Sequence, residues 1–177
     1  MSSTPIPPQP TSLPGSPLRR RLLMAGALCP VVPIVGVPSA RAAEPVSARL
    51  PASANLAAEI RRAVDGGSPL VVMVSLSGCP FCNVVRDSYL APLRREIGLP
   101  VVQVDMRSAV ASTDAKGGRT SHDELARGWK VRIAPTVLFL GRDGVELAER
   151  LVGGYLAEFY GAYLEQRLEQ ARRTLKA

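Results

Sequence analysis

Apolar residues after position 50 follow two kinds of pattern that alternate along the chain. In residues 55–64, NLAAEIRRAV, apolar side chains recur four positions apart and two glycines follow, which predicts an amphipathic helix. Pro69–Leu76, PLVVMVSL, is a nearly continuous apolar run, as expected for a strand that is buried on both faces of a sheet. Pro100–Met106 and Ala134–Leu140 are runs of the same kind, so they predict two further strands.

The first of these strands is followed by a predicted helix that begins at Cys79 or just after it. Its expected buried residues are Val84, Val85 and Tyr89. Pro92 should break or kink this helix, because proline has no backbone N–H to donate and its ring clashes with the preceding turn. We expect a short helical piece, PLRREIG, to restart there.

The segment between the second and third strands is more polar. Residues 107–120 are small, polar and glycine-containing, which favours a loop or a weakly ordered insertion. Ser121 and Glu124 form a capping box for a helix over HDELARGW, and in this interpretation His122 is exposed in the first turn. A loop and then a helix are therefore expected here.

Residues 141–144, GRDG, follow the third strand and predict a hairpin turn. The turn leads into a more polar strand, VELAERLV at 145–152, and a final helix is expected from about Tyr155 to Leu175. This order of elements predicts the α/β class, with a central mixed β-sheet and helices on both of its faces.

Residues 1–42 have a different pattern, which is that of an export signal. Three arginines precede a charge-free apolar stretch, Leu22–Ala40, and Ala40 and Ala42 then form an A-x-A cleavage site. Cleavage after Ala42 would leave residues 43–177 as a mature, periplasmic domain. The arginines also resemble the twin-arginine export pattern, so both that route and the general secretory route are open.

Two other interpretations of the apolar stretch are weaker. It is long enough to span a bilayer of about 30 Å, but it contains three prolines, which disfavour a spanning helix. A lipoprotein signal ending at Cys29 needs a small residue before that cysteine, where the sequence has Leu28. A cleaved signal peptide is therefore the preferred interpretation.

Removal of the signal changes both the charge and the cysteine count. The whole chain has 22 basic and 15 acidic residues, a net charge of +7, and four of the basic residues lie in 1–42. The rest of the chain has 18 basic and 15 acidic residues, and this mild excess of +3 does not indicate nucleic-acid binding. Cys29 leaves with the signal, so Cys79 and Cys82 have only each other as partners.

The two remaining cysteines stand in the motif SGCPFC, directly after the first predicted strand. A structural zinc site needs four ligands, and the mature chain adds only His122 to the two cysteines, so we expect no metal and no other cofactor. A structural disulfide across so short a loop would remove little entropy from the unfolded chain. A redox-active pair is the interpretation that the spacing favours.

The redox interpretation gives the two cysteines different roles. At the start of a helix, Cys79 faces unpaired backbone N–H groups and the positive end of the helix dipole, which favour a thiolate. This thiolate attacks a substrate disulfide, and Cys82, one turn further along and more buried, then resolves the mixed disulfide. Pro80 suits the first helical turn, and Phe81 adds an apolar surface for substrate beside the reactive sulfur.

Taken together, these motifs resemble the thioredoxin superfamily. The strand ending in SGCPFC, the later IAPT, the RDG turn, the Gly153–Gly154 pair and the amphipathic last helix follow the order of the thioredoxin fold over nearly all of residues 50–175. The resemblance implies that Pro135 is a cis-proline and that the Ala134–Pro135 backbone is the edge on which a substrate strand pairs. Within the superfamily, the chain is similar to exported bacterial thioredoxin-related proteins, including the SoxW-like proteins found with periplasmic sulfur-oxidation systems.

Three features depart from thioredoxin itself. Thioredoxin has Cys-Gly-Pro-Cys, a preceding Trp and a buried Asp six positions before the first cysteine, where this chain has Cys-Pro-Phe-Cys, Gly78 and Met73. No buried acid is therefore expected beside Cys82, and the group that accepts its proton is left open.

The resemblance also implies a direction of electron flow and a set of partners. Strong oxidants of this fold carry a His between their cysteines that stabilises the thiolate, and Phe81 stands there in this chain. We therefore expect a periplasmic reductant of protein or small-molecule disulfides, supplied with electrons by a membrane thiol carrier. The alternatives are a disulfide-forming oxidant of the same fold and a non-catalytic binding module.

Overall fold

A four-stranded sheet forms the centre of the part of the chain that the computed structural model describes, residues 49–154 and 157–177. Its strands lie in the order β2 (Val101–Asp105), β1 (Leu70–Ser75), β5 (Thr136–Leu140) and β6 (Leu151–Val152). β1 runs parallel to β2 and antiparallel to β5, and β5 runs antiparallel to β6, so the sheet is mixed as predicted. The predicted export signal lies outside the described residues.

The two central strands are buried along their whole length. Every residue of β1 and of β5 is buried, because helices cover the sheet on both sides. A strand buried on both faces has no position left for a solvent-facing polar side chain, which explains why both sequences read as continuous apolar runs. These two strand predictions are confirmed.

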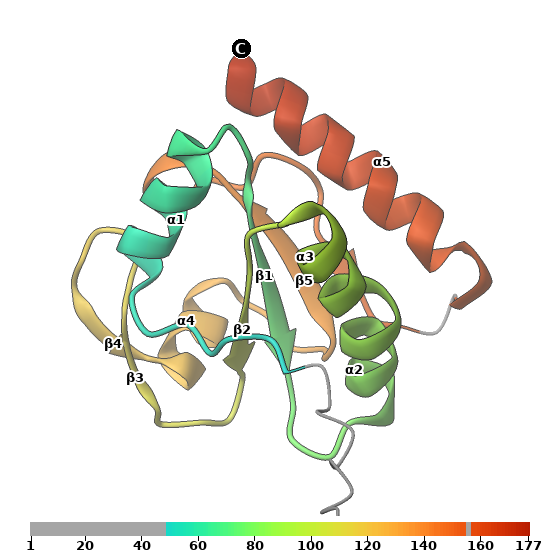
Figure 1. The fold of residues 1–177 in the computed structure, drawn as a ribbon. Coiled ribbons are helices and arrows are strands. Elements are labelled where there is room, and N and C mark those ends of the chain that lie inside the picture. The colour runs from blue at the N-terminus through green and yellow to red at the C-terminus, as the bar shows by residue number, and fades with distance from the viewer. Residues whose placement is uncertain (1–48, 155–156) are drawn as a thin grey trace, which may run out of the picture. The chain divides into compact units, whose positions relative to one another are not determined.

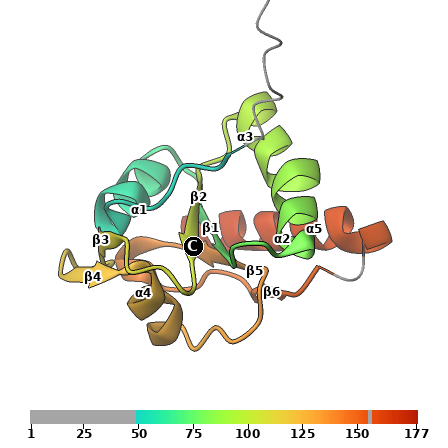
Figure 2. The ribbon, with the colours of Figure 1, turned by 90° about the horizontal axis from the view of Figure 1, so that it is seen from below.

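Helices pack on both faces of the sheet (Figures 1 and 2). α1 (Leu56–Asp65) and α4 (His122–Gly128) cover one face. A helical run that follows β1 and the long helix α5 (Ala157–Lys176) cover the other, which we call the α5 face. The predicted α/β class with helices on both faces is confirmed. Among the described helices, none combines the length and the apolar character that crossing a membrane requires.

The helical run after β1 changes from α-helix to π-helix before it reaches Pro92. The run consists of α2 (Pro80–Val85), the π-helix η1 (Arg86–Leu90) and α3 (Ala91–Ile97). In η1 the backbone N–H of the residue at the end bonds a carbonyl five positions back, which widens the helix. Pro92 then lies in the first turn of α3, where its missing N–H leaves no bond unmade. The expected interruption is therefore a π-turn and not a break.

The side chains expected to be buried on this run are only partly confirmed. Val85 is buried, and Tyr89 packs partly buried against the core of the α5 face. Val84 is 41% exposed, so its predicted burial is wrong. The buried positions of α2 are Cys82 and Val85, three apart, and this spacing turns Val84 toward solvent.

The polar segment 107–120 is not a simple loop. It contains most of a two-stranded antiparallel hairpin, β3 (Ala111–Thr113) and β4 (Arg119–Ser121). The carboxylate of Asp114 closes the turn, because it accepts hydrogen bonds from the backbone N–H groups of Lys116 and Gly118, both at 2.8 Å. The loop prediction is wrong because these three-residue strands are too short and polar to show an apolar alternation.

The segment after β5 forms less strand than predicted. A 3-10 turn, η2 (Arg142–Gly144), stands where a hairpin turn was expected, but regular pairing returns only at β6. In between, the Arg150 side chain donates to the carbonyl of Trp129 at 2.8 Å, and Leu147 packs against Gly141. Glu146 bridges Leu140, and the N–H of Leu147 donates to the carbonyl of Phe139 at 2.8 Å, so residues 145–150 keep isolated contacts with β5. They form no regular strand, and that part of the prediction is wrong.

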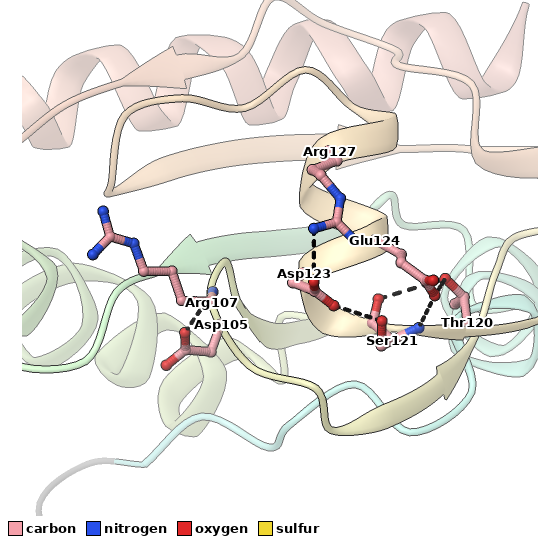
Figure 3. Close-up of polar contacts among 7 residues, drawn as sticks. All are labelled: Asp105, Arg107, Thr120, Ser121, Asp123, Glu124 and Arg127. Atoms are coloured by element: carbon pink, nitrogen blue, oxygen red, sulfur yellow. Dashed lines mark hydrogen bonds and ion pairs between the residues drawn. The ribbon is translucent and has the colours of Figure 1, made fainter.

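The start of α4 shows both a confirmed and a wrong prediction. The capping box is present, with the N–H of Ser121 donating to Glu124 Oε2 at 2.9 Å (Figure 3). His122, however, is 3% exposed rather than exposed in the first turn. Its Nδ1 accepts from the N–H of Asp105 at 3.2 Å, and its Nε2 donates to the carbonyl of Ser53 at 2.8 Å. The ring therefore ties α4 to β2 and to the segment before α1.

Candidate active site

The two cysteines of SGCPFC lie at the junction between β1 and α2. After β1 the chain turns through Gly78, whose φ of 75° lies in the left-handed region that favours glycine. Cys79 is the N-cap of α2, and Cys82 lies in its first turn. Both cysteines are free thiols in this structure. The prediction of a helix that starts at or just after the first cysteine is confirmed.

The sulfur of Cys79 is held between two segments that are far apart in the sequence. The backbone N–H of Cys82 donates to Cys79 Sγ at 3.3 Å, in the position of a helix-capping bond. On its other side, the Cys79 thiol donates to the carbonyl of Ala134 at 3.9 Å. Cys79 is half-buried, so a substrate disulfide can reach its sulfur. The sulfur thus has a backbone N–H on one side and a backbone carbonyl on the other.

Cys82 lies in opposite surroundings. Its side chain is 1% exposed and belongs to the core of the α5 face. Burial, reinforced by a hydrogen bond with Cys79, raises the pKa of the Cys82 thiol to about 11, although the Leu76 backbone and the Ser75 hydroxyl act in the other direction. Cys82 is therefore a protonated thiol at neutral pH.

The loop before β5 supplies the wall opposite the dithiol. The peptide bond between Ala134 and Pro135 is cis, the geometry that the family resemblance implied, and Pro135 is buried. The Thr136 hydroxyl donates to the carbonyl of Ile133 at 2.7 Å, and the N–H of Gly153 donates to the carbonyl of Pro135 at 2.7 Å. These bonds hold the loop so that the Ala134 carbonyl meets Cys79.

Gly154 brings the end of β6 against both walls of the site. A Cβ at this position would lie 3.3 Å from Pro135 Cγ, 3.3 Å from Val85 Cγ2 and 3.4 Å from Phe81 Cβ. Such contacts are tighter than ordinary packing, so only glycine fits without displacing a neighbour. The Gly153–Gly154 pair thus has a packing role that the sequence did not reveal.

Exposed apolar side chains lie on the three segments that form the site. Phe81 is 54% exposed in α2, Ile133 is 53% exposed next to Ala134, and Val152 is 45% exposed in β6. Pro80, also exposed, begins α2. The structure brings together all the residues predicted for the site, and it adds Ile133 and Val152. Ile133 is the first residue of the IAPT motif and Val152 directly precedes the Gly153–Gly154 pair, so these two motifs were the sequence signal for them.

Within residues 49–154 and 157–177, no three or more His, Cys, Asp and Glu side chains form a group that could hold a metal ion. His122, the third ligand that the zinc alternative required, has both ring nitrogens engaged by Asp105 and Ser53. The expectations that the protein uses no metal and no cofactor stay predictions.

The chain was compared with known protein families. Residues 56–168 match the family described as thioredoxin-like domain. This span contains both cysteines, the Ala134–Pro135 loop and most of α5. A comparison with curated proteins found no significant match.

Solved structures with a similar arrangement include thioredoxins. Mitochondrial thioredoxin 3 from Saccharomyces cerevisiae is 18% identical over 66% of this chain and 93% of its own, with a TM-score of 0.44. Spinach chloroplast thioredoxin f is 15% identical over 70% of this chain and 94% of its own, with a TM-score of 0.47. The periplasmic thioredoxin SoxS from Paracoccus pantotrophus is 22% identical over 58% of this chain and 97% of its own, with a TM-score of 0.38.

Proposed function

The chain belongs to the thioredoxin-like domain family of thiol–disulfide oxidoreductases, and on this premise we propose that it reduces disulfides of exported polypeptides through Cys79 and Cys82. The observation that carries the proposal is the unequal placement of the two sulfurs. One is half-buried, capped by a backbone N–H and in contact with the Ala134 carbonyl, and the other is buried beneath it.

In the first step, the Cys79 thiolate attacks one sulfur of the substrate disulfide. A bond forms between Cys79 Sγ and that sulfur, and the other substrate sulfur leaves with the electron pair of the broken bond. An extended substrate segment would lie along Ala134 and Pro135 and cover Phe81, Ile133 and Val152. Burial of these exposed apolar side chains favours binding of polypeptides over small polar disulfides.

In the second step, Cys82 loses its proton and attacks Cys79 Sγ. The bond between Cys79 and the substrate breaks, the substrate leaves as a thiolate, and a Cys79–Cys82 disulfide remains. Two electrons have passed from the dithiol to the substrate. A dithiol donor must then reduce the protein, and in a periplasm kept oxidising this donor would be a membrane thiol carrier.

The reducing direction is supported by the residue between the cysteines. Phe81 is apolar and half in solvent, so it places no positive charge beside the Cys79 thiolate. A reduced form without such stabilisation is less favoured, which makes the disulfide harder to reduce and the dithiol a better donor. A disulfide-forming oxidant of the same fold is the alternative, and the sequence of residues 1–42 supports a periplasmic location for either.

Turnover of insulin disulfides with dithiothreitol as donor tests the activity. The wild-type protein should accelerate the reaction, and a variant in which both cysteines are replaced should not. A wild-type protein with no activity would leave the alternative of a binding module.

Equilibration with glutathione tests the direction. A reduction potential below about −230 mV supports a reductant, and a value above about −170 mV places the protein with oxidants and isomerases.

A further inference from the structure

The resolving step needs a route for the Cys82 proton, and the core beneath the dithiol offers no acid. Met73, the position six residues before Cys79, is fully buried in the same apolar core as Cys82. A thioether cannot accept the proton. The question rests on the proposed function, because a proton must leave Cys82 only if Cys82 attacks Cys79.

Ser75 is the polar group that reaches the buried sulfur from the sheet. It is the last residue of β1 and is 2% exposed. Side chains alternate along a strand, so Ser75 faces the same side as Val71 and Met73, which is the α5 face where Cys82 lies. The Ser75 hydroxyl lies close enough to the Cys82 sulfur to lower the pKa of the Cys82 thiol, against the larger effect of burial. A buried hydroxyl, which both donates and accepts, therefore lies on the same face as the atom that must lose a proton and close to it.

Asp105 is the neighbour of Ser75 in the sheet. The two residues are register partners in the parallel pairing of β1 with β2, so their side chains lie on the same face. The backbone of Asp105 is fixed by its N–H bond to the ring of His122. Its Oδ1 accepts from the N–H of Arg107 at 3.0 Å, and Figure 3 shows this carboxylate apart from the polar cluster at the start of α4. The carboxylate of Asp105 therefore lies on the same face as the Ser75 hydroxyl, on the neighbouring strand.

A polar pocket connects these two residues to solvent. It has a volume of about 440 Å³ and is lined by Ser75 and Asp105 together with Arg49, Asn83, Arg86 and Gln103. Arg49 and Asn83 are exposed, so the pocket reaches the surface. Its lining within the described residues does not include Cys79, Phe81 or the Ala134–Pro135 loop. It is roomy and polar enough to hold water.

We propose that Ser75 relays the Cys82 proton into this pocket, where Asp105 and pocket water receive it. Cys82 gives its proton to Ser75 Oγ while Ser75 gives its own proton to water bound near Asp105. The freed electron pair of Cys82 forms the bond to Cys79 Sγ, and the electron pair of the Cys79–substrate bond leaves with the substrate sulfur. The substrate disulfide is the only oxidant, and the reverse transfer accompanies reduction of the protein.

The other titratable and charged groups around Cys82 do not serve as this acceptor. Cys79 is consumed in the mixed disulfide at this step. Tyr160 from α5 has a buried hydroxyl without a partner among the described residues, and burial raises its pKa further above the usual value, so it stays a neutral phenol. Tyr89 from η1 packs against Tyr160. Arg86 and Arg49 line the pocket as cations and hold no lone pair for a proton.

Reaction of the reduced protein with one equivalent of dithionitrobenzoate separates the two steps. Attack by Cys79 releases a first thionitrobenzoate, and attack by Cys82 releases a second, so each step has its own absorbance phase. In Ser75→Ala the second phase should slow by about 10²-fold, the lower end of what a positioned proton acceptor contributes, while the first phase changes less than about twofold. The slowed phase should rise more steeply with pH than in wild type, because hydroxide must then take the proton.

Three further variants complete the test. Ser75→Thr keeps a hydroxyl and should restore most of the second phase, and Asp105→Asn should slow that phase alone. Ser112→Ala removes another buried serine, on β3, and should change neither phase. A second phase in Ser75→Ala within about twofold of wild type, or equal slowing of both phases, would overturn the relay. Release of only one equivalent by the wild-type protein would instead refute the proposed function.

Discussion

Cys79 and Cys82 lie one helical turn apart, yet their sulfurs have opposite surroundings. Cys79 is half-buried at a rim of exposed apolar side chains, Phe81, Ile133 and Val152. Cys82 is 1% exposed and lies near Ser75, which lines a polar pocket. In the proposed function, one side of the dithiol would receive a polypeptide and the other would hold a proton. The difference supports the proposed assignment of Cys79 as the nucleophile and Cys82 as the resolving cysteine.

The largest expected contrast is in the reactivity of the two thiols toward iodoacetamide. Because burial raises the Cys82 pKa to about 11, only a fraction on the order of 10⁻⁴ of Cys82 is thiolate at pH 7. Cys79 should be alkylated more than about 10²-fold faster, as mass spectrometry of partly labelled, reduced protein would show. Equal labelling of both cysteines in the folded protein would remove the contrast.

The apolar rim around Cys79 is tested by polar substitution. Ile133→Ser and Val152→Ser should each raise the KM for insulin about fivefold, since each removes roughly 1 kcal/mol of apolar burial on binding. Val145→Ser changes a valine that is 61% exposed outside the site, and it should leave KM unchanged. If all three variants behave alike, the rim is not the substrate surface.

The buried side of the dithiol should make the stability of the reduced protein depend on alkaline pH. The folded-state pKa of Cys82, about 11, lies above its ordinary value of 9.0, so the folded state holds this proton more tightly. Its contribution is complete below pH 9.0 and is lost as pH rises toward about 11. Urea unfolding should show a steeper loss across this window in wild type than in Cys82→Ala. Parallel pH profiles for the two proteins would show that Cys82 is not responsible.

The smallest expected effect is on stability and concerns Gly154, which packs between the Pro135 loop and α2. Gly154→Ala should cost about 1 kcal/mol of stability, because its Cβ would press on Pro135, Val85 and Phe81. Gly128→Ala, where a Cβ meets nothing within 4 Å at the end of α4, should instead stabilise by about 0.5–1 kcal/mol. Thermal unfolding of both variants provides the measurement, and a neutral Gly154→Ala would refute the close packing at that glycine.

The parts of the molecule that could be predicted from the sequence depend on local patterns. The runs at Leu70–Ser75 and Thr136–Leu140 are apolar because both faces of these strands are covered. The capping box joins Ser121 to Glu124, only three positions further along the chain. The dithiol is recognisable for the same reason, since its spacing and its place at a helix start are both local.

The parts that could not be predicted depend on segments that meet only in the folded chain. His122 looks like an exposed first-turn residue until β2 and Ser53 surround its ring. Ser75 is an ordinary strand end until β2 places Asp105 beside it. Ile133 and Val152 become one surface only when the loop before β5 and the end of β6 meet at Cys79. The spacing of residues along the chain does not predict any of these contacts.

Trapping of the mixed disulfide tests the division of roles between the two cysteines most directly. The reduced Cys82→Ser and Cys79→Ser variants are each incubated with insulin that has its disulfides intact. The products are analysed by mass spectrometry without a reductant. Cys82→Ser should accumulate an insulin adduct on Cys79, because the nucleophile is present and the resolving thiol is missing. Cys79→Ser should form no adduct, since Cys82 is buried and protonated. An adduct on Cys82 in comparable yield, or no adduct in either variant, would contradict this account.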